Sequence, residues 1–240
     1  FSKMLDYHIE SKNDITVLYQ NVNTANEDFL MCDTLDIDEN KVITNIDKNL
    51  GKGKRAKVSL ETYIMSKKIF IDMIYAALST SSLYSLSDII ADGLDVFKIG
   101  GYLHTGYAAC ISTLNSYYKA SMDIKNEKEL SNIFSDDWPI YTATNDTCPT
   151  TYTKTSNVSN CVVGNGCIIE GTVENCVIGR NVVVKEGAVI KDSIIMPDAL
   201  INKNVKMDKC VVDRLAIVTH IKALNGSEHA PLYVKRGDRI

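Results

Sequence analysis

Cysteine is the residue type in this sequence that could do the widest range of chemistry, because a thiol binds metals, forms disulfides and attacks electrophiles. The spacing argues against such roles, since there is no C-x-x-C pair and no histidine at zinc-ligand spacing. Four of the cysteines fall in a repetitive segment where small apolar residues are expected to face a core. We therefore interpret them as reduced core thiols rather than as disulfides or metal ligands. The cysteines are Cys32, Cys110, Cys148, Cys161, Cys167, Cys176 and Cys210.

A second candidate for chemistry is the segment Gly51–Lys57, which places four positive charges among small residues. Basic side chains and backbone amides suit phosphate groups, so a phosphorylated sugar effector is one possible ligand. A solvated connection between two strands explains the same composition. No aromatic side chain is interleaved with the charges, so we do not expect nucleic acid binding.

Composition limits the function classes. Of the 240 residues, 45% are hydrophobic and 23% are charged, which excludes wholesale disorder. The net charge of −4 gives no general attraction to nucleic acid or to acidic membranes. No apolar run is long enough for a transmembrane helix and no signal region opens the chain, so we expect a cytoplasmic protein. The opening FSKMLDYHIE lacks an initiator methionine, and we expect that an N-terminal part is missing.

The patterns of residues 1–134 are typical of an α/β domain, because helical and strand periodicities alternate. The helix expected at 69–78 should bury Met73 and Leu78, among other apolar residues. Strands are expected at 14–19 and 60–66 and within 95–107, helices at 2–10, 69–78, 86–94 and 111–122, and a hairpin at 29–46.

Residues 135–157 are rich in Thr, Asn and Pro, and we interpret them as an extended linker that Trp138 anchors to a neighbouring domain. In residues 158–240 apolar residues recur every six positions, with two slips of the register, a period that no α-helix has. This period predicts a parallel β-helix of hexapeptide repeats with a C-terminal tail. The first apolar series is Val163, Ile169, Ile178, Val184, Ile190, Met196, Ile201 and Met207.

A β-helix of this kind does not decide the function, because it occurs in acyltransferases and also behind nucleotidyltransferase domains. Acyl transfer needs a histidine base, and residues 157–213 contain no histidine. His220 and His229 lie beyond the repeats and are interpreted as solvated residues. A coenzyme A-dependent acyltransferase is therefore the least favoured alternative.

The order of the segments, and several phrases at matching spacing, resemble bacterial ADP-glucose pyrophosphorylase along essentially the whole chain. The phrases are LNSYYKASMDI, DWPIYT and CVIGRNVVVKEGAVIKDSIIMP. The resemblance implies that residues 1–134 are the C-terminal part of a Rossmann-like nucleotidyltransferase domain and that the β-helix is left-handed. It also implies the conversion of glucose 1-phosphate and ATP to ADP-glucose and pyrophosphate, with Mg²⁺ as the family's cofactor.

The resemblance assigns three residues to a vestigial substrate site. The family motif Glu-Lys-Pro corresponds to Asp47-Lys48-Asn49, in which Lys48 can pair with a phosphate. The sugar-contacting strand Ser-Met-Gly-Ile-Tyr corresponds to the stretch that begins at Thr62. In that stretch Ile64 replaces a glycine that lets the sugar approach the backbone.

Two further departures concern catalysis. The family's His-Asp-Phe-Gly segment, whose Asp faces the sugar, has Tyr84 at the Asp position. Its Trp-Arg-Asp-Val-Gly-Thr segment supplies a carboxylate to Mg²⁺, and Cys110 stands in that place, where a thiol is a poor ligand. With no adjacent His, Lys or Arg, Cys110 is not expected to be an activated nucleophile. We therefore assign no catalytic and no metal-binding residue in this chain.

These departures, together with LETYIMSKK, resemble the D-type subunits of the family. The resemblance implies a regulatory or structural subunit in glycogen biosynthesis, weakly active or inactive alone, whose own enzyme status stays open. Its partner would be a catalytic subunit of the pyrophosphorylase, or it would self-associate, with the β-helix as the assembly element. The alternative is an active sugar-phosphate nucleotidyltransferase with divergent metal and sugar ligands.

Overall fold

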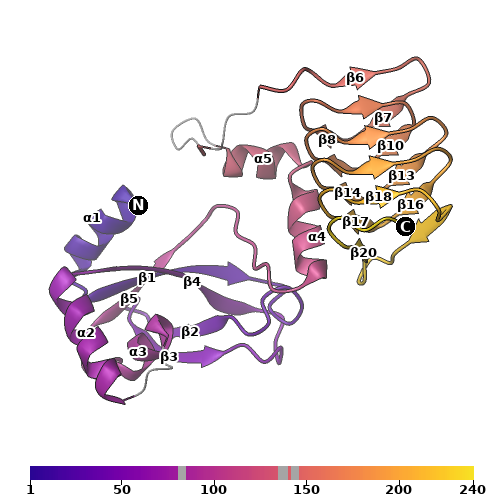
Figure 1. Ribbon diagram of the computed structural model, residues 1–240. Coiled ribbons are helices and arrows are strands. Elements are labelled where there is room, and N and C mark those ends of the chain that lie inside the picture. The colour runs from indigo at the N-terminus through magenta and orange to yellow at the C-terminus, as the bar shows by residue number, and fades with distance from the viewer. Residues whose placement is uncertain (81–84, 135–139, 142–145) are drawn as a thin grey trace. The chain divides into compact units, whose positions relative to one another are not determined.

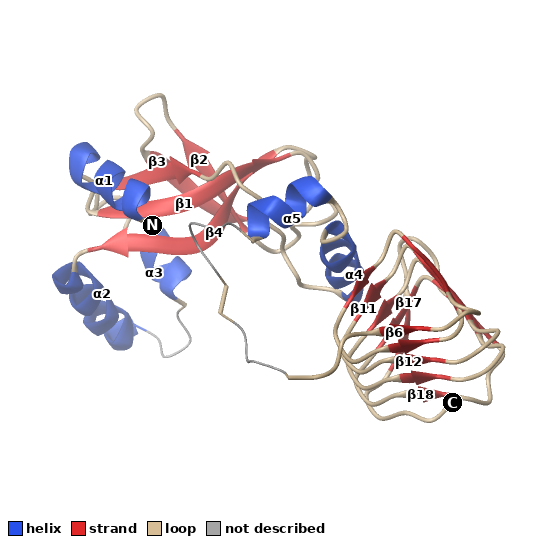
Figure 2. Ribbon diagram, turned by 90° about the horizontal axis from the view of Figure 1, so that it is seen from above, coloured by secondary structure: helices blue, strands red, loops and turns tan. Residues whose placement is uncertain are grey.

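The computed structural model of the protein describes residues 1–240 except 81–84, 135–139 and 142–145 (Figure 1). The chain divides into two compact units, Phe1–Cys110 and Ile111–Ile240. Figure 2 colours the helices and strands of both units. Trp138, expected to anchor a linker, and Tyr84 lie outside the described residues.

The first unit is a five-stranded mixed sheet with three helices. Its elements are α1 (Ser2–Ser11), β1 (Ile15–Val22), β2 (Asp33–Ile37), β3 (Ile43–Lys48), β4 (Ala56–Met65), α2 (Lys67–Thr80), α3 (Leu86–Asp92) and β5 (Ile99–Leu103). The strand order is β3-β2-β4-β1-β5, in which only β1 and β5 are parallel. The core joins residues of β1, β2, β3 and β5 to residues of α2 and α3: Ile15, Val17, Leu35, Ile43, Met73, Ile90 and Ile99.

The α/β pattern expected for this part of the chain is confirmed, including the hairpin of β2 and β3. The Asp38 carboxylate closes the hairpin turn, because it accepts hydrogen bonds from the backbone amides of Asn40 and Val42 at 2.9 and 2.8 Å. One burial prediction is wrong. Met73 of α2 is buried, but Leu78 is 66% exposed. Five residues of helix rotate a side chain by about 140°, so these two residues face different sides.

The second unit is a parallel β-solenoid preceded by two helices, α4 (Leu114–Asp123) and α5 (Glu127–Ile133). Three five-stranded parallel sheets form its sides, so the predicted β-helix is confirmed. The first sheet contains β6 (Thr151–Tyr152), β9 (Ile168–Ile169), β12 (Val183–Val184), β15 (Leu200–Ile201) and β18 (Ile217–Val218). The second contains β7 (Asn157–Ser159), β10 (Thr172–Glu174), β13 (Val189–Lys191), β16 (Lys206–Asp208) and β19 (Ala223–Asn225). The third contains β8 (Val162–Val163), β11 (Val177–Ile178), β14 (Ile194–Ile195), β17 (Cys210–Val212) and β20 (Leu232–Val234).

The solenoid begins inside the segment interpreted as a linker, because β6 pairs with β9. Its coils are shorter than three full hexads. Val189 pairs with Thr172 on one side and with Lys206 on the other, an offset of 17 residues. The missing residue lies between Ile190 and the next core residue, which is the fully buried Ile195. Met196, predicted for that core position, is instead partly buried outside the core.

A column of residues with left-handed backbone makes the short side of each coil: Asn160 (φ 49), Asn175 (φ 57), Asp192 (φ 42) and Lys209 (φ 51). Asn and Asp tolerate this conformation better than other residues with a Cβ atom. The column is also hydrogen bonded from coil to coil, since the Asn160 amide donates to the Asn175 side chain at 2.8 Å and the Asn175 amide donates to the Asp192 carboxylate. Asparagine and aspartate thus fix the tight turn.

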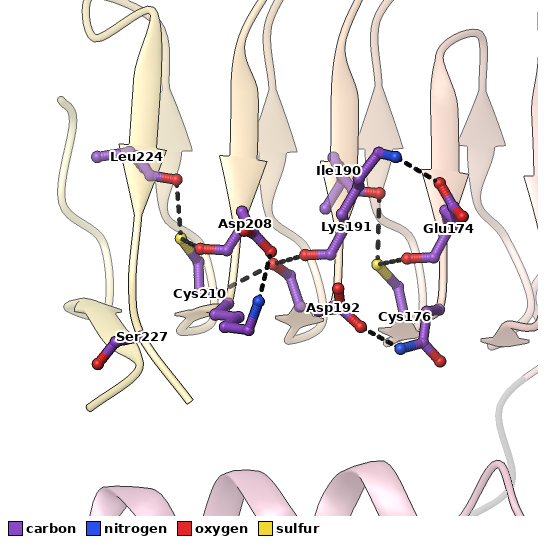
Figure 3. A network of polar contacts seen from close by, with 12 residues as sticks. Glu174, Cys176, Ile190, Lys191, Asp192, Asp208, Cys210, Leu224 and Ser227 are labelled. Carbon is purple, nitrogen blue, oxygen red and sulfur yellow. Dashed lines mark hydrogen bonds and ion pairs between the residues drawn. The ribbon is translucent and has the colours of Figure 1, made fainter. Parts of the chain in front are cut away.

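The next position of each coil is Cys161, Cys176, Ser193 and Cys210, and these side chains satisfy backbone carbonyls at the turn. The Cys176 sulfur lies within hydrogen-bond distance of the carbonyl oxygens of Glu174 and Ile190, and the Cys210 sulfur of those of Asp208 and Leu224, so that each thiol hydrogen is shared between two acceptors (Figure 3). Cys176 and Cys210 are fully buried, as expected of core thiols.

Helix α4 covers part of the outer surface of the solenoid. Tyr118 packs against Ile194 and Val211, whose side chains face away from the solenoid core. The Tyr118 hydroxyl donates to the carbonyl oxygen of Asp192 at 2.5 Å. The Lys125 ammonium, which follows α4, donates to the carbonyl oxygen of Asn175 at 3.1 Å. The helix is therefore fastened to the column of left-handed residues.

Candidate functional site

Lys48 and Asp47, two of the three residues assigned to the substrate site, end strand β3 and point to opposite faces of the sheet. The Lys48 ammonium lies 2.6 Å from a carboxylate oxygen of Asp33, its direct neighbour on β2. The Asp33 side chain is 5% exposed, whereas that of Lys48 is 47% exposed. The hydrogen bond to Asp33 raises the pKa of Lys48 above its ordinary value. The ammonium is therefore held by a buried partner.

The surroundings of Lys48 are acidic. Besides Asp33, the charges of Asp88 on α3 and Glu61 on β4 also raise the Lys48 pKa. The same three carboxylates add to the effect of burial, which raises the pKa of Tyr63 to about 12. The second oxygen of the Asp33 carboxylate is buried and accepts no hydrogen bond from the residues described. Three acids therefore act on the Lys48 ammonium, which disfavours a phosphate dianion as its partner.

Thr62 lies in a β-bulge of β4. The pairing of β1 with β4 shifts between Val17 and Tyr19, and Glu61 has a positive φ of 49° at the same place. The Thr62 hydroxyl donates to the carbonyl oxygen of Leu60 at 3.1 Å. It therefore serves the backbone of the bulge. Such bulges re-aim side chains, and this one brings Glu61 within electrostatic range of Lys48.

Asp47 and Lys48 line an open cleft of about 690 Å³ together with the basic segment Gly51–Lys57. The cations of the segment that line the cleft are Lys52, Arg55 and Lys57, and the Lys57 ammonium also donates to the carbonyl oxygen of Ile37 at 3.2 Å. The structure thus brings together the substrate motif and the basic segment, which the sequence treated separately. Thr62 does not line this cleft.

Cys110 stands where the family resemblance places a ligand of Mg²⁺, and its surroundings do not fit that ion. Its sulfur lies 3.1 Å from the sulfur of Cys32, beside the apolar side chains of Phe29 and Val58. Within the described part of the chain, no group of three His, Cys, Asp or Glu side chains could hold a metal. Two thiols among apolar groups lack the hard oxygen ligands that Mg²⁺ requires.

The contact between Cys32 and Cys110 is the feature that sequence reasoning missed. The two residues are 78 positions apart, and no local spacing signals the contact. Burial and the hydrogen bond to Cys110 raise the pKa of Cys32 to about 12. Elsewhere, Ile64 is half-buried on β4, and both His220 and His229 are exposed in the segments after β18, as expected.

The chain is similar in sequence to known proteins along most of its length. Residues 146–226 match the family model described as GlmU-like, C-terminal hexapeptide. The chain is 35% identical over 179 residues to the glycogen biosynthesis protein GlgD of Bacillus subtilis (strain 168), an alignment that covers 75% of this chain and 52% of that protein. The chain belongs to the glucose-1-phosphate adenylyltransferase family. The membership expected from the three quoted phrases is therefore confirmed.

Two other relatives align with similar shares of this chain and of their own length. GlgD of Geobacillus stearothermophilus is 32% identical over 189 residues, covering 79% of this chain and 53% of that protein. The glucose-1-phosphate adenylyltransferase of Mycoplasma mobile is 29% identical over 193 residues, covering 79% and 50%. The chain thus spans about half the length of these relatives. Among the described residues, no helix has the length and hydropathy needed to cross a bilayer.

Proposed function

We propose that the protein is a regulatory or structural subunit of ADP-glucose pyrophosphorylase, acting in glycogen biosynthesis, and that it is weakly active or inactive alone. The relatives named GlgD, a glycogen biosynthesis protein, support the process. The relatives named glucose-1-phosphate adenylyltransferase support the assignment to this enzyme rather than to another one of the same process. The impaired chemistry is inferred from this chain's own residues.

The observation that carries the proposal is the ion pair of Lys48 with Asp33. A phosphate dianion that took Lys48 would leave the 5%-exposed Asp33 carboxylate without its only ion-pair partner in the described residues. Leaving a buried charged group unpaired costs on the order of 1–3 kcal/mol or more. The dianion would also approach Glu61 and Asp88, which act on the same ammonium. Lys48 is thus a structural cation here, not a phosphate ligand.

Cys110 supports the same proposal. Mg²⁺ neutralises the charges that meet when a sugar phosphate attacks ATP. The described residues around Cys110 offer a second thiol and apolar groups in place of a carboxylate. If the loss of one metal ligand forfeits roughly 4 kcal/mol of transition-state stabilisation, the rate falls by about a thousandfold.

The cleft beside the basic segment supports a regulatory role. Lys52, Arg55 and Lys57 line it together with two acids, Asp36 and Asp47. Leaving out Lys48, whose ammonium is held by Asp33, three cations still face two carboxylates, a balance that favours an anion. We place a phosphorylated sugar effector in this cleft, with the basic segment as its contact. The backbone amide of Gly53, which lines the cleft, would add a hydrogen bond to the phosphate.

The solenoid supports assembly. Strands β6, β7 and β8 at one end, and β19 and β20 at the other, each pair with a sheet strand on one side only, whereas the outer side of β18 pairs with Arg239. Such edges present unpaired backbone groups that a neighbouring chain can cover. The proposed partner is a catalytic subunit of the pyrophosphorylase, and a second copy of the chain is the alternative.

Native mass spectrometry and calorimetry test this proposal. The full-length protein, mixed with a catalytic subunit, should give a mixed oligomer. Titrated alone with glucose 1-phosphate, it should give no heat at concentrations that saturate the catalytic subunit. Tight binding of glucose 1-phosphate that is lost in Lys48→Gln, with the fold intact by circular dichroism, would instead support the active nucleotidyltransferase with divergent ligands.

A further inference from the structure

The sulfur atoms of Cys32 and Cys110 lie 3.1 Å apart, which places two free thiols in direct contact inside the first unit. Cys32 precedes β2, and Cys110 ends the segment that follows β5. Both side chains are partly buried. They pack beside an apolar cluster that contains Phe29 and Val58.

The backbone holds the two residues in place. The Cys32 amide donates to the carbonyl oxygen of Phe29 at 3.3 Å, and the Cys32 carbonyl accepts from the Asn49 amide at 2.9 Å. On the other side, the Gln20 side chain donates to the carbonyl oxygen of Gly106 at 3.0 Å, four residues before Cys110. Because both segments are tied to the sheet, the thiols meet without a large change of the backbone.

The other described thiols have different surroundings. Cys161, Cys167, Cys176 and Cys210 all donate to backbone carbonyl oxygens within the solenoid. Cys148 is exposed. Cys161 and Cys176 also interact with each other, but both lie on the repeats of the solenoid, where carbonyl oxygens accept from their thiols. Cys32 and Cys110 instead contact each other directly through their sulfur atoms.

We propose that Cys32 and Cys110 are a reversible redox pair, which a low-molecular-weight disulfide such as glutathione disulfide converts to an intramolecular disulfide. The Cys110 thiolate attacks one sulfur of glutathione disulfide, forms a mixed disulfide and releases one glutathione thiolate. The Cys32 thiolate then attacks the Cys110 sulfur and releases the second glutathione. Two protein thiols lose two protons and two electrons, and one glutathione disulfide becomes two glutathione thiols.

The order of the two steps follows from the surroundings. The pKa of Cys32 is raised, so this residue is almost entirely protonated at neutral pH and reacts slowly with glutathione disulfide from solution. In the second step Cys32 attacks a sulfur that is already beside it, which compensates for the small thiolate fraction. The bond fastens the end of the first unit to the residue that precedes Asp33.

The pair is tested by redox titration of the full chain in buffers of reduced and oxidised glutathione. Free thiols are trapped with iodoacetamide, and unreduced digests are read by mass spectrometry. We expect a linked peptide that contains Cys32 and Cys110. Its half-oxidation should require on the order of tenfold less oxidised glutathione than mixed-disulfide formation at Cys148, because the partner thiol is already in place.

Matched variants distinguish a specific disulfide between Cys32 and Cys110 from non-specific disulfides that involve other cysteines. Cys110→Ala should abolish the linked peptide and leave Cys32 alkylated, whereas Cys148→Ala should change nothing. If Cys110→Ala fails to fold, the peptide yields of the wild-type chain decide by themselves. Complete alkylation of Cys32 and Cys110 in buffers that modify Cys148 would overturn the proposal, and so would equal yields of linked peptides containing Cys148.

Discussion

The Lys48 ammonium and the Asp33 carboxylate form a 2.6 Å ion pair between the neighbouring strands β3 and β2, in which the acid is buried and the base is half exposed. The two partners depend on each other to different degrees. Water can replace Asp33 as the partner of Lys48, but it cannot reach the carboxylate to replace Lys48. The side chain that the family resemblance assigns to a phosphate is therefore needed by the protein's own acid.

Substitutions at this pair should have unequal effects. Lys48→Met leaves a buried carboxylate unpaired, and it should lower the free energy of unfolding by about 1–3 kcal/mol. Asp33→Asn removes the buried charge and should cost less, and the double variant should regain much of the loss. Urea unfolding of the full chain measures these values, with Lys52→Met in the same cleft as the control. Equal losses in Lys48→Met and Lys52→Met would contradict the role of the pair.

Tyr118 should anchor α4 to the solenoid. Its side chain is 8% exposed, and its hydroxyl donates to the Asp192 carbonyl. Tyr118→Phe should lower stability by about 1–2 kcal/mol, because the partly buried carbonyl of Asp192 loses its donor. Thermal unfolding measures the loss, with Tyr141→Phe as an exposed control. A loss equal to that of the control would contradict the anchor.

The same residue predicts a pH dependence. Burial is the main cause that raises the Tyr118 pKa from 10.0 to about 12. The neutral hydroxyl is favoured in the folded state, so its contribution is complete below pH 10 and is lost as the pH rises from 10 towards 12. Wild type and Tyr118→Phe should therefore converge in stability over that range. A constant difference between them would argue against the raised pKa.

Much of the fold could be predicted from the sequence, because the solenoid repeats one local rule. An apolar residue at about every sixth position, and Asn or Asp at the turns, can be read directly from the sequence. The shortened side was missed for a local reason. Ile194, Ile195 and Met196 are consecutive apolar residues, so composition does not say which faces inward. The left-handed turn at Asp192 decides in favour of Ile195.

The site was less predictable, since its properties depend on pairing register and distant contacts. Lys48 was identified by its motif, but its partner Asp33 becomes visible only when β2 and β3 are aligned. Glu61 reaches the same place through a bulge that no turn signal marks. The contact between Cys32 and Cys110 spans 78 positions. Only the folded sheet brings these groups together.

Lys209 occupies a position of the left-handed column that Asn160, Asn175 and Asp192 fill in the other coils. A left-handed conformation costs a lysine about 1–2 kcal/mol, and an asparagine less. Lys209→Asn should therefore raise the free energy of unfolding by about 0.5–1 kcal/mol. Lys206→Asn, in the strand β16 of the same coil, should not stabilise. Chemical denaturation compares them, and a destabilising Lys209→Asn would contradict the assigned strain.

Cys161 should be the most acidic thiol of the solenoid. The hydrogen bond from Cys176 is the main cause that lowers its pKa from 9.0 to about 6, and Lys125 contributes. Because the folded state favours the thiolate, its contribution to stability is complete above pH 9 and is lost as the pH falls through 6. Alkylation of Cys161 should stay fast down to about pH 6 and slow in Lys125→Gln, while buried Cys210 stays unreactive. Alkylation that already declines below pH 9 would contradict the lowered pKa.

The central claim is that this protein modulates a catalytic partner and makes little ADP-glucose itself. One assay tests it most directly. Formation of pyrophosphate from glucose 1-phosphate, ATP and Mg²⁺ is measured for the full-length protein alone, for a catalytic subunit alone and for their mixture. We predict that the rate of the protein alone is lower than that of the catalytic subunit by about a thousandfold or by a larger factor. In the mixture we predict a changed rate or a changed effector response. Robust turnover by the protein alone, or a mixture identical to the catalytic subunit, would contradict the claim.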